Sequence, residues 1–244
     1  MGLFNDFTQT KQMGDNMKKT LSLLAVLMVA GVAATPAQAA KHYVSGFGGI
    51  SWMQNIQTSD TYQSATPGDN ETADVDLGSG LAVTGAIGCD YGSYRLEGEV
   101  GYQTNDINSA ILSNGITHSP SFPLRGDISV LSLMGNGYYD FDLGSKAELY
   151  ATAGVGVAQV SAHNITLNYP NNTDPGWSAH ETTLAWQVGA GLAAPIADHV
   201  KLDLRYRYFA TTDFTLTGDH NVALQTGNTN LSSHSVLLGL RVDF

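Results

Sequence analysis

The chain has 244 residues, a net charge of −11 at pH 7 and one cysteine. So acidic a protein has no electrostatic means of binding nucleic acid, because it repels the phosphate backbone, and a single cysteine rules out an internal disulfide. No apolar run reaches the roughly 20 residues that a transmembrane helix needs.

The first segment with a clear pattern is typical of an export signal. A basic start at residues 17–20 precedes the apolar run 21–32, and the stretch ends in the small-x-small sequence Ala37-Gln38-Ala39. This order is that of a secretory signal peptide, and the apolar run is too short to span a membrane. We therefore predict an extension that is not used in the cell (1–16), a signal peptide (17–39) and a single barrel domain (40–244).

After the leader, apolar residues alternate with polar or small ones in eight blocks. A period of two residues predicts strands with two different faces. Each block is long enough to cross a bilayer at a tilt, which takes about 9 to 11 residues. The blocks cover 42–53, 81–90, 94–103, 128–141, 147–160, 183–194, 200–209 and 235–244.

The connections between these blocks alternate between short and long. The short ones, at 91–93, 142–146 and 195–199, are rich in Gly, Asp and Pro, as tight turns are. The long polar ones cover 54–80, 104–127, 161–182 and 210–231. A soluble sandwich has no reason to segregate its loops in this way. The layout predicts an all-β fold: an eight-stranded, antiparallel, up-and-down transmembrane β-barrel with short periplasmic turns and long extracellular loops.

Charged residues gather on one face of three blocks. A shift of one residue would place them in hydrocarbon, at about 2–4 kcal/mol for each mid-bilayer Arg or Lys, so the register is strongly specified. We expect them to form an ion-pair network that plugs the lumen, because an unpaired buried charge is costly. Glycines that share the inward face of two blocks (Gly154, Gly156, Gly189 and Gly191) leave space, which keeps a pore open as an alternative. The predicted interior charges are Arg95, Glu97, Glu99, Lys201, Asp203, Arg205, Arg207, Arg241 and Asp243.

Aromatic residues on the opposite faces fit two interfacial girdles. Tyr94 and Tyr102 lie eight residues apart on one face. At about 3.3 Å per residue and a tilt of about 40°, they are separated by about 20 Å along the membrane normal. The predicted girdle residues are Trp52, Tyr94, Tyr102, Tyr139, Trp186, Tyr206 and Tyr208.

The sequence gives little sign of catalysis. His118, His163, His180 and His220 fall in the long loops, where weak metal binding is an option but no ligand spacing is present. His234 and Ser235 are neighbours on one strand and point to opposite faces, so they cannot form a nucleophile–base pair. We predict no catalytic residue, no metal site and no cofactor.

Several stretches carry a resemblance to a known family. YVSGFGG, YRLEGEVGY, GNGYYDF, AWQVGAGLAAPIADHVKLDLRYRYF and the final LLGLRVDF, in this order and spacing, resemble the OmpA-like or opacity-type eight-stranded outer-membrane β-barrel proteins, often labelled "porin family" or surface antigens. We expect the last block to close the barrel against the first. The terminal aromatic strand, with Val242 and Phe244, also resembles the C-terminal signal that the outer-membrane barrel assembly machinery reads.

Three functions remain open. The leading one is a structural, surface-exposed barrel in the outer membrane, whose loops contact host or matrix molecules or the lipopolysaccharide layer. The second is a narrow pore for small solutes, and the third is a lipid A-modifying enzyme. A closed barrel has no free edge, so we expect a monomer whose partners are outer-membrane lipid, lipopolysaccharide and the assembly machinery.

Overall fold

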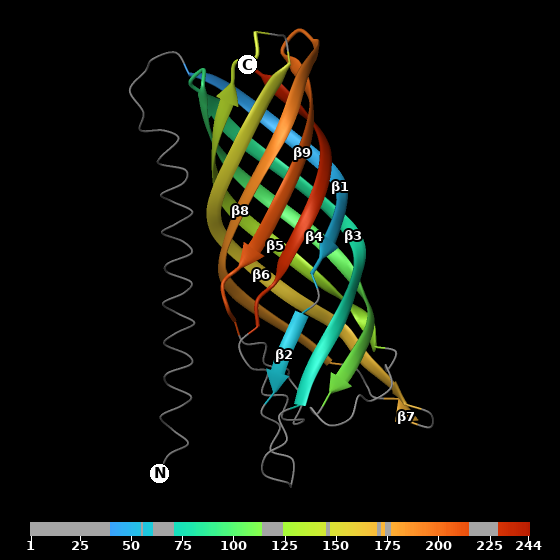
Figure 1. Cartoon of the computed structure of the whole chain (residues 1–244). Helices are drawn as coiled ribbons and strands as arrows, with labels where there is room; N and C mark the ends of the chain where they lie inside the picture. The colour runs from blue at the N-terminus through green and yellow to red at the C-terminus, as the bar shows by residue number, and fades with distance from the viewer. Residues whose placement is uncertain are drawn as a thin grey trace, which may run out of the picture. The chain divides into compact units, whose positions relative to one another are not determined.

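Ten antiparallel strands form in the computed structural model, which describes residues 40–54, 56–60, 71–113, 124–144, 147–169, 172–173, 177–214 and 229–244 (Figure 1). The predicted extension and signal peptide lie outside these described residues. Within them, no helix has the length and apolar character needed to cross a membrane. The strands are β1 (Lys41–Met53), β2 (Ile56–Asp60), β3 (Glu71–Asp90), β4 (Tyr94–Ser113), β5 (Leu124–Phe141), β6 (Glu148–Tyr169), β7 (Asn172–Thr173), β8 (Trp177–Ala197), β9 (Val200–Thr211) and β10 (Ser232–Asp243).

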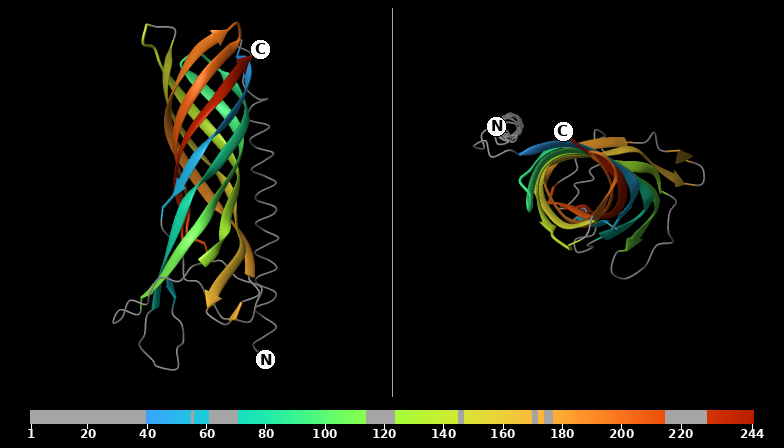
Figure 2. Two further views of the ribbon diagram at one scale, coloured as in Figure 1. Left: turned by 90° about the vertical axis from the view of Figure 1, so that its right-hand side faces the viewer. Right: turned by 90° about the horizontal axis from the view of Figure 1, so that it is seen from above.

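Eight long strands close into a barrel, while β2 and β7 only extend its rim. The sheet runs β1-β10-β9-β8-β6-β5-β4-β3, and β3 pairs back with β1. The closing seam is continuous from Tyr43 opposite Asp243 to Met53 opposite Ser233, and an end-on view shows the closed ring (Figure 2). The predicted eight-stranded antiparallel barrel is confirmed.

Side chains alternate between the lumen and the outside along each strand. In β10, Leu237 is fully buried whereas Leu238 is 54% exposed. The exposed row of that strand is apolar, with Val236, Leu240 and Val242 beside Leu238. This is the inverse of a water-soluble protein, and it matches a barrel whose outer face contacts lipid.

Tight turns join the strands at one end, which we call the turn end. Gly92 and Gly144 adopt positive φ angles of 95° and 62°, and their N–H groups donate to Asp90 Oδ1 and Asp142 Oδ1 at 2.7 and 2.8 Å. Such Asp side chains stabilise turns by bonding the backbone two residues on. The predicted turn 195–199 is shorter than expected, because β8 runs to Ala197 and only residues 198–199 separate it from β9.

At the opposite end, which we call the loop end, the strands run further than we predicted. Parts of the expected loops 54–80, 104–127 and 161–182 are strand: β2 and β7, the starts of β3, β5 and β8, and the ends of β4 and β6. Beyond the hydrocarbon a strand needs no apolar outer row, so ladder hydrogen bonds continue where the apolar alternation stops. The alternation therefore marked the lipid-facing part of each strand rather than its full length.

Candidate functional site

Charged and polar side chains fill the part of the barrel interior toward the turn end. We call them the polar layer. Seven of the nine charged residues proposed for the lumen are at most 3% exposed: Arg95, Glu97, Glu99, Asp203, Arg205, Arg207 and Arg241. The side chains of Lys201 and Asp243 are 17% exposed at the turn end. All nine come from β4, β9 and β10, whose alternate residues face inward.

Glu97 and Glu99 lie near the middle of the polar layer and accept several hydrogen bonds. The hydroxyl groups of Tyr43 and Tyr138 donate to Glu97 at 3.1 and 2.5 Å. Arg205 Nη1 donates to Glu99 Oε2 at 2.9 Å and lies 4.0 Å from Glu97. A buried carboxylate requires such partners, because an unpaired charge in this surrounding is costly.

Arg95 forms a bidentate ion pair with Asp140 on the neighbouring strand β5. Its Nε and Nη2 each donate to one carboxylate oxygen at 2.7 Å. The guanidinium group also stacks over the rings of Tyr138 and Tyr150, 4.4 and 4.9 Å from their centroids. Planar bidentate pairing and stacking are properties of arginine that lysine lacks.

Charges also gather at the turn end of the lumen. Glu148, at the start of β6, accepts hydrogen bonds from both Lys201 and Arg241. Asp243 lies 3.7 Å from Lys201 and 3.6 Å from Arg241. We did not predict Asp140 or Glu148 as interior residues, because each lies at a strand end where the sequence reads equally well as a turn.

Arg207 lies above this cluster, toward the loop end. Its Nη2 donates to Gln103 Oε1 at 3.1 Å, and its Nη1 lies 3.8 Å from Glu99. Its Nε has no protein partner, and neither do the buried hydroxyls of Thr84 and Thr152 or Gln187 Oε1. Polar atoms buried in this way are ordinarily satisfied by internal water.

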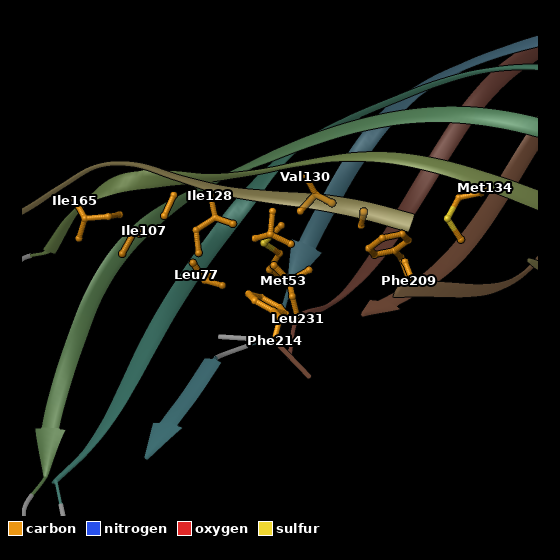
Figure 3. Close-up of a cluster of buried hydrophobic side chains, with 14 residues drawn as sticks. Met53, Leu77, Ile107, Ile128, Val130, Met134, Ile165, Phe209, Phe214 and Leu231 are labelled. Carbon is orange, nitrogen blue, oxygen red and sulfur yellow. The ribbon is translucent and has the colours of Figure 1, made fainter. Parts of the chain in front are cut away.

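Toward the loop end the lumen contains a large cluster of buried apolar side chains, which we did not predict. Fourteen buried side chains from the inward faces of the strands and from the β9–β10 connection form one cluster there (Figure 3). We call this cluster the apolar layer, and its larger members include Met53, Ile128, Met134, Phe209 and Leu231. Its residues are at most 8% exposed, so these side chains pack against one another inside the barrel.

The inward glycines leave no open space, contrary to our expectation. A Cβ atom built on Gly154 would lie 2.0 Å from Asn136 Oδ1, and one on Gly191 would lie 2.2 Å from Tyr150 Oη. Neighbouring side chains therefore fill the volume above these glycines. The glycines do not keep the lumen open. Their lack of a side chain makes room for large polar side chains that reach into the lumen.

The proposed girdle residues lie on the outer face in two groups. At the turn end, the rings of Tyr94 and Tyr139 are 5.1 Å apart. Toward the loop end, the rings of Trp186 and Tyr208 are 5.4 Å apart, and Trp52, Tyr102 and Tyr206 are 40–50% exposed. The separation into two groups is the arrangement that interfacial aromatic residues adopt in membrane barrels.

His234 and Ser235 point to opposite sides of the barrel wall. His234 Nδ1 lies 2.6 Å from Tyr206 Oη on the outer face, while Ser235 is fully buried in the lumen. The imidazole therefore cannot serve as a base for this hydroxyl. Among the described residues, no three His, Cys, Asp or Glu side chains are grouped closely enough to hold a metal ion; His118 and His220 lie outside them.

The two C-terminal residues proposed as an assembly signal both face outward. Val242 is 38% and Phe244 is 74% exposed. The N–H of Phe244 donates to the His42 carbonyl at 2.8 Å, so the last residue is held against the start of β1.

Comparison with known proteins places the fold in context. The model of the "Outer membrane protein beta-barrel domain" family matches residues 22–244. "Outer membrane protein PagN" of Salmonella typhimurium is 27% identical over 126 residues, which are 50% of this chain and 52% of that protein. "Putative adhesin RC1281" of Rickettsia conorii is 28% identical over 178 residues, which are 68% of this chain and 69% of that protein.

Solved structures agree on the architecture. The outer membrane protein OprG of Pseudomonas aeruginosa superimposes with a TM-score of 0.52 at 14% identity, covering 84% of this chain and 96% of that one. A major outer membrane protein of Thermus thermophilus gives 0.51 at 15% identity, covering 85% and 100%. At such identities the likeness shows the fold alone.

Proposed function

Because the chain belongs to the family defined by the outer membrane protein beta-barrel domain, and thus resides in the outer membrane, we propose that it is a structural barrel that contacts a host or matrix molecule through its loop end. The named relatives are described as an outer membrane protein or an adhesin and not as enzymes. A surface role is the reading that these descriptions support.

The length of the strands at the loop end carries this proposal. Strands β3, β4, β5, β6 and β8 have 20, 20, 18, 22 and 21 residues, whereas about 9 to 11 suffice to cross a bilayer. Almost half of each strand therefore lies beyond the hydrocarbon. A protein whose only task was to span the membrane would gain nothing from this extension, whereas a binding surface needs to be raised above the lipid.

Side chains fill the barrel interior, and this supports a binding role rather than a pore. The polar layer is crosslinked by ion pairs such as Arg205–Glu99, and the apolar layer lies above it. Ions would have to pass buried apolar side chains such as Phe209 and Leu231, which cannot replace their hydration shell. We therefore propose that the lumen is closed to solutes.

Adhesion by whole cells tests the surface role. The barrel is expressed in a non-adherent Gram-negative host and compared with variants in which 166–176 or 215–228 are replaced by Asn-Gly, a two-residue hairpin turn. The flanking pairs Ile165–Trp177 and Phe214–Thr229 are already opposite each other, so the register is kept. We expect wild-type cells to bind epithelial cells or extracellular matrix, and at least one variant to lose most of this binding.

The control variant is Lys41→Gln, an exposed change at the turn end. It should bind as wild type does, and all variants should migrate faster on gels when unboiled, which shows a folded barrel. Wild-type cells that bind no better than empty-vector cells would overturn the proposal. Single-channel conductance of the purified barrel would instead support the pore, and a change in lipid A mass on expression would support an enzyme.

A further inference from the structure

A polar hollow lies at the loop end, between strands β6 and β8. It is lined by Gln159, Ser161, His163, Ser178 and His180, together with Ala162 and Ala179. Two imidazole groups that are 17 residues apart in the sequence thus share one depression. The spacing along the chain gave no sign of this, because the pairing of the two strands creates it.

The register explains how the histidines meet. His180 lies directly opposite Ser161, and a bulge interrupts the ladder between Ala162 and Ile165, next to His163. His180 shares the outer face of β8 with Trp186, six residues away. At about 3.3 Å per residue and a tilt of about 40°, the hollow lies roughly 15 Å beyond the girdle, in the aqueous region.

Asp127 on β5 orients one of the two imidazoles. Its Oδ2 lies 3.3 Å from His163 Nδ1, and the two residues are register partners. This contact leaves Nε2 as the imidazole nitrogen that does not face the carboxylate. Metal-binding histidines commonly have a carboxylate at their second ring nitrogen, which orients the ring.

The surrounding charge favours a cation. Asp106 on β4 is the register partner of Asp127, so a second carboxylate lies on the β5 side of His163. A negative field raises the local concentration of cations. Imidazole nitrogen selects zinc, copper and nickel over calcium and magnesium, which prefer oxygen.

We propose that His163 and His180 bind a divalent transition-metal ion of the Zn²⁺, Cu²⁺ or Ni²⁺ class, with Asp127 as the positioning residue for His163. The site supplies two protein nitrogens, so water or Gln159 occupies the remaining positions. Rotamer changes of an exposed side chain such as His180 take picoseconds to nanoseconds, so this ring can turn toward an ion held by His163 without a change in the backbone. The site is independent of the proposed adhesion and stands or falls without it.

Copper provides the most specific probe. One equivalent of Cu²⁺ is added to the folded barrel in detergent, and its electron paramagnetic resonance spectrum is recorded. We expect superhyperfine splitting from two nitrogens. His163→Gln and His180→Gln should each reduce this to one nitrogen, and calorimetric titration with Zn²⁺ should show weaker binding. Asp127→Asn should weaken Zn²⁺ binding by about 10-fold to 100-fold while keeping both nitrogens.

The matched control is His234→Gln, which removes an outward histidine that does not line the hollow. It should leave the spectrum and the Zn²⁺ affinity unchanged, and the shift between boiled and unboiled samples should show that every variant is folded. Two-nitrogen coordination that persists in the double variant His163→Gln/His180→Gln would overturn the proposal. Wild-type protein that shows no bound Cu²⁺ beyond the buffer signal would do the same.

Discussion

Arg205 and Glu99 form an ion pair across the barrel interior, 2.9 Å apart and with side chains no more than 2% exposed. The Arg205 guanidinium also lies 3.9 Å from the centroid of the Phe47 ring and donates to Tyr150 Oη at 3.2 Å. One residue of β9 therefore links β4, β1 and β6 through the lumen. Such a crosslink makes the closed barrel sensitive to the loss of either partner.

Arg205→Met should destabilise the barrel by about 3–5 kcal/mol, because it leaves Glu99 as a buried charge without its nearest cation. Urea unfolding in lipid vesicles measures the change. The double variant Arg205→Met/Glu99→Leu should recover part of the loss, since apolar residues of similar volume replace a buried pair at little cost. Asp106→Asn, an exposed change on the same strand as Glu99, serves as the control. If the Arg205→Met variant were as stable as the wild type, the Arg205–Glu99 pair would not stabilise the barrel.

Phe209→Ala should destabilise the barrel by about 3–5 kcal/mol, as expected for a large aromatic side chain removed from a packed interior. Phe209 is 1% exposed and belongs to the apolar layer. The comparison is Leu238→Ala on the lipid-facing side, where lipid fills the space left behind and no cavity remains. Equal losses in urea unfolding would show that the apolar layer is not packed like a protein core.

The interior charges could be predicted because a charged side chain on a membrane-spanning strand is costly toward lipid and must therefore face the lumen. Arg95, Glu97 and Glu99 alternate with apolar residues, so strand parity alone specified their direction. Their partners across the lumen depend on closure of the barrel and on its tilt, which no single strand encodes. Asp140 and Glu148 were missed because each lies at a strand end, where the sequence reads equally well as a turn.

Part of the apolar layer was missed because it lies on β5, which carries apolar residues on both faces. In β5, Ile128, Val130 and Met134 face inward while Leu131 faces outward. Where both faces are apolar, a period of two is invisible and the sequence cannot indicate which residues face the lumen. The strand extensions were missed for the opposite reason, since both of their faces are largely polar. The histidine pair required the β6–β8 register, which the sequence does not specify.

Leu238→Arg should cost about 2–4 kcal/mol, because Leu238 faces lipid near the middle of its strand and lies opposite Leu204, another lipid-facing residue. Val242→Arg, nearer the turn end on the same face, should cost only about 0–1 kcal/mol, because a long side chain there reaches the interface. The free energies of unfolding of the two variants in lipid vesicles are compared. Their difference checks that Leu238 lies near the middle of the membrane and Val242 near its interface. Equal costs would mean that this face does not cross hydrocarbon.

Phe244→Ala should lower the amount of barrel that reaches the outer membrane and leave its intrinsic stability almost unchanged. The ring is 74% exposed and its centroid lies 6.3 Å from that of the His42 ring, so its loss removes little packing. The backbone hydrogen bonds between these two residues do not involve the side chain. If the exposed aromatic end is read during assembly, as we predict, the deficit appears in cells and is absent when the purified chain folds into detergent. Quantifying the heat-modifiable band in outer membranes and the folding yield in detergent separates the two effects. A parallel drop in both would assign Phe244 a structural role instead.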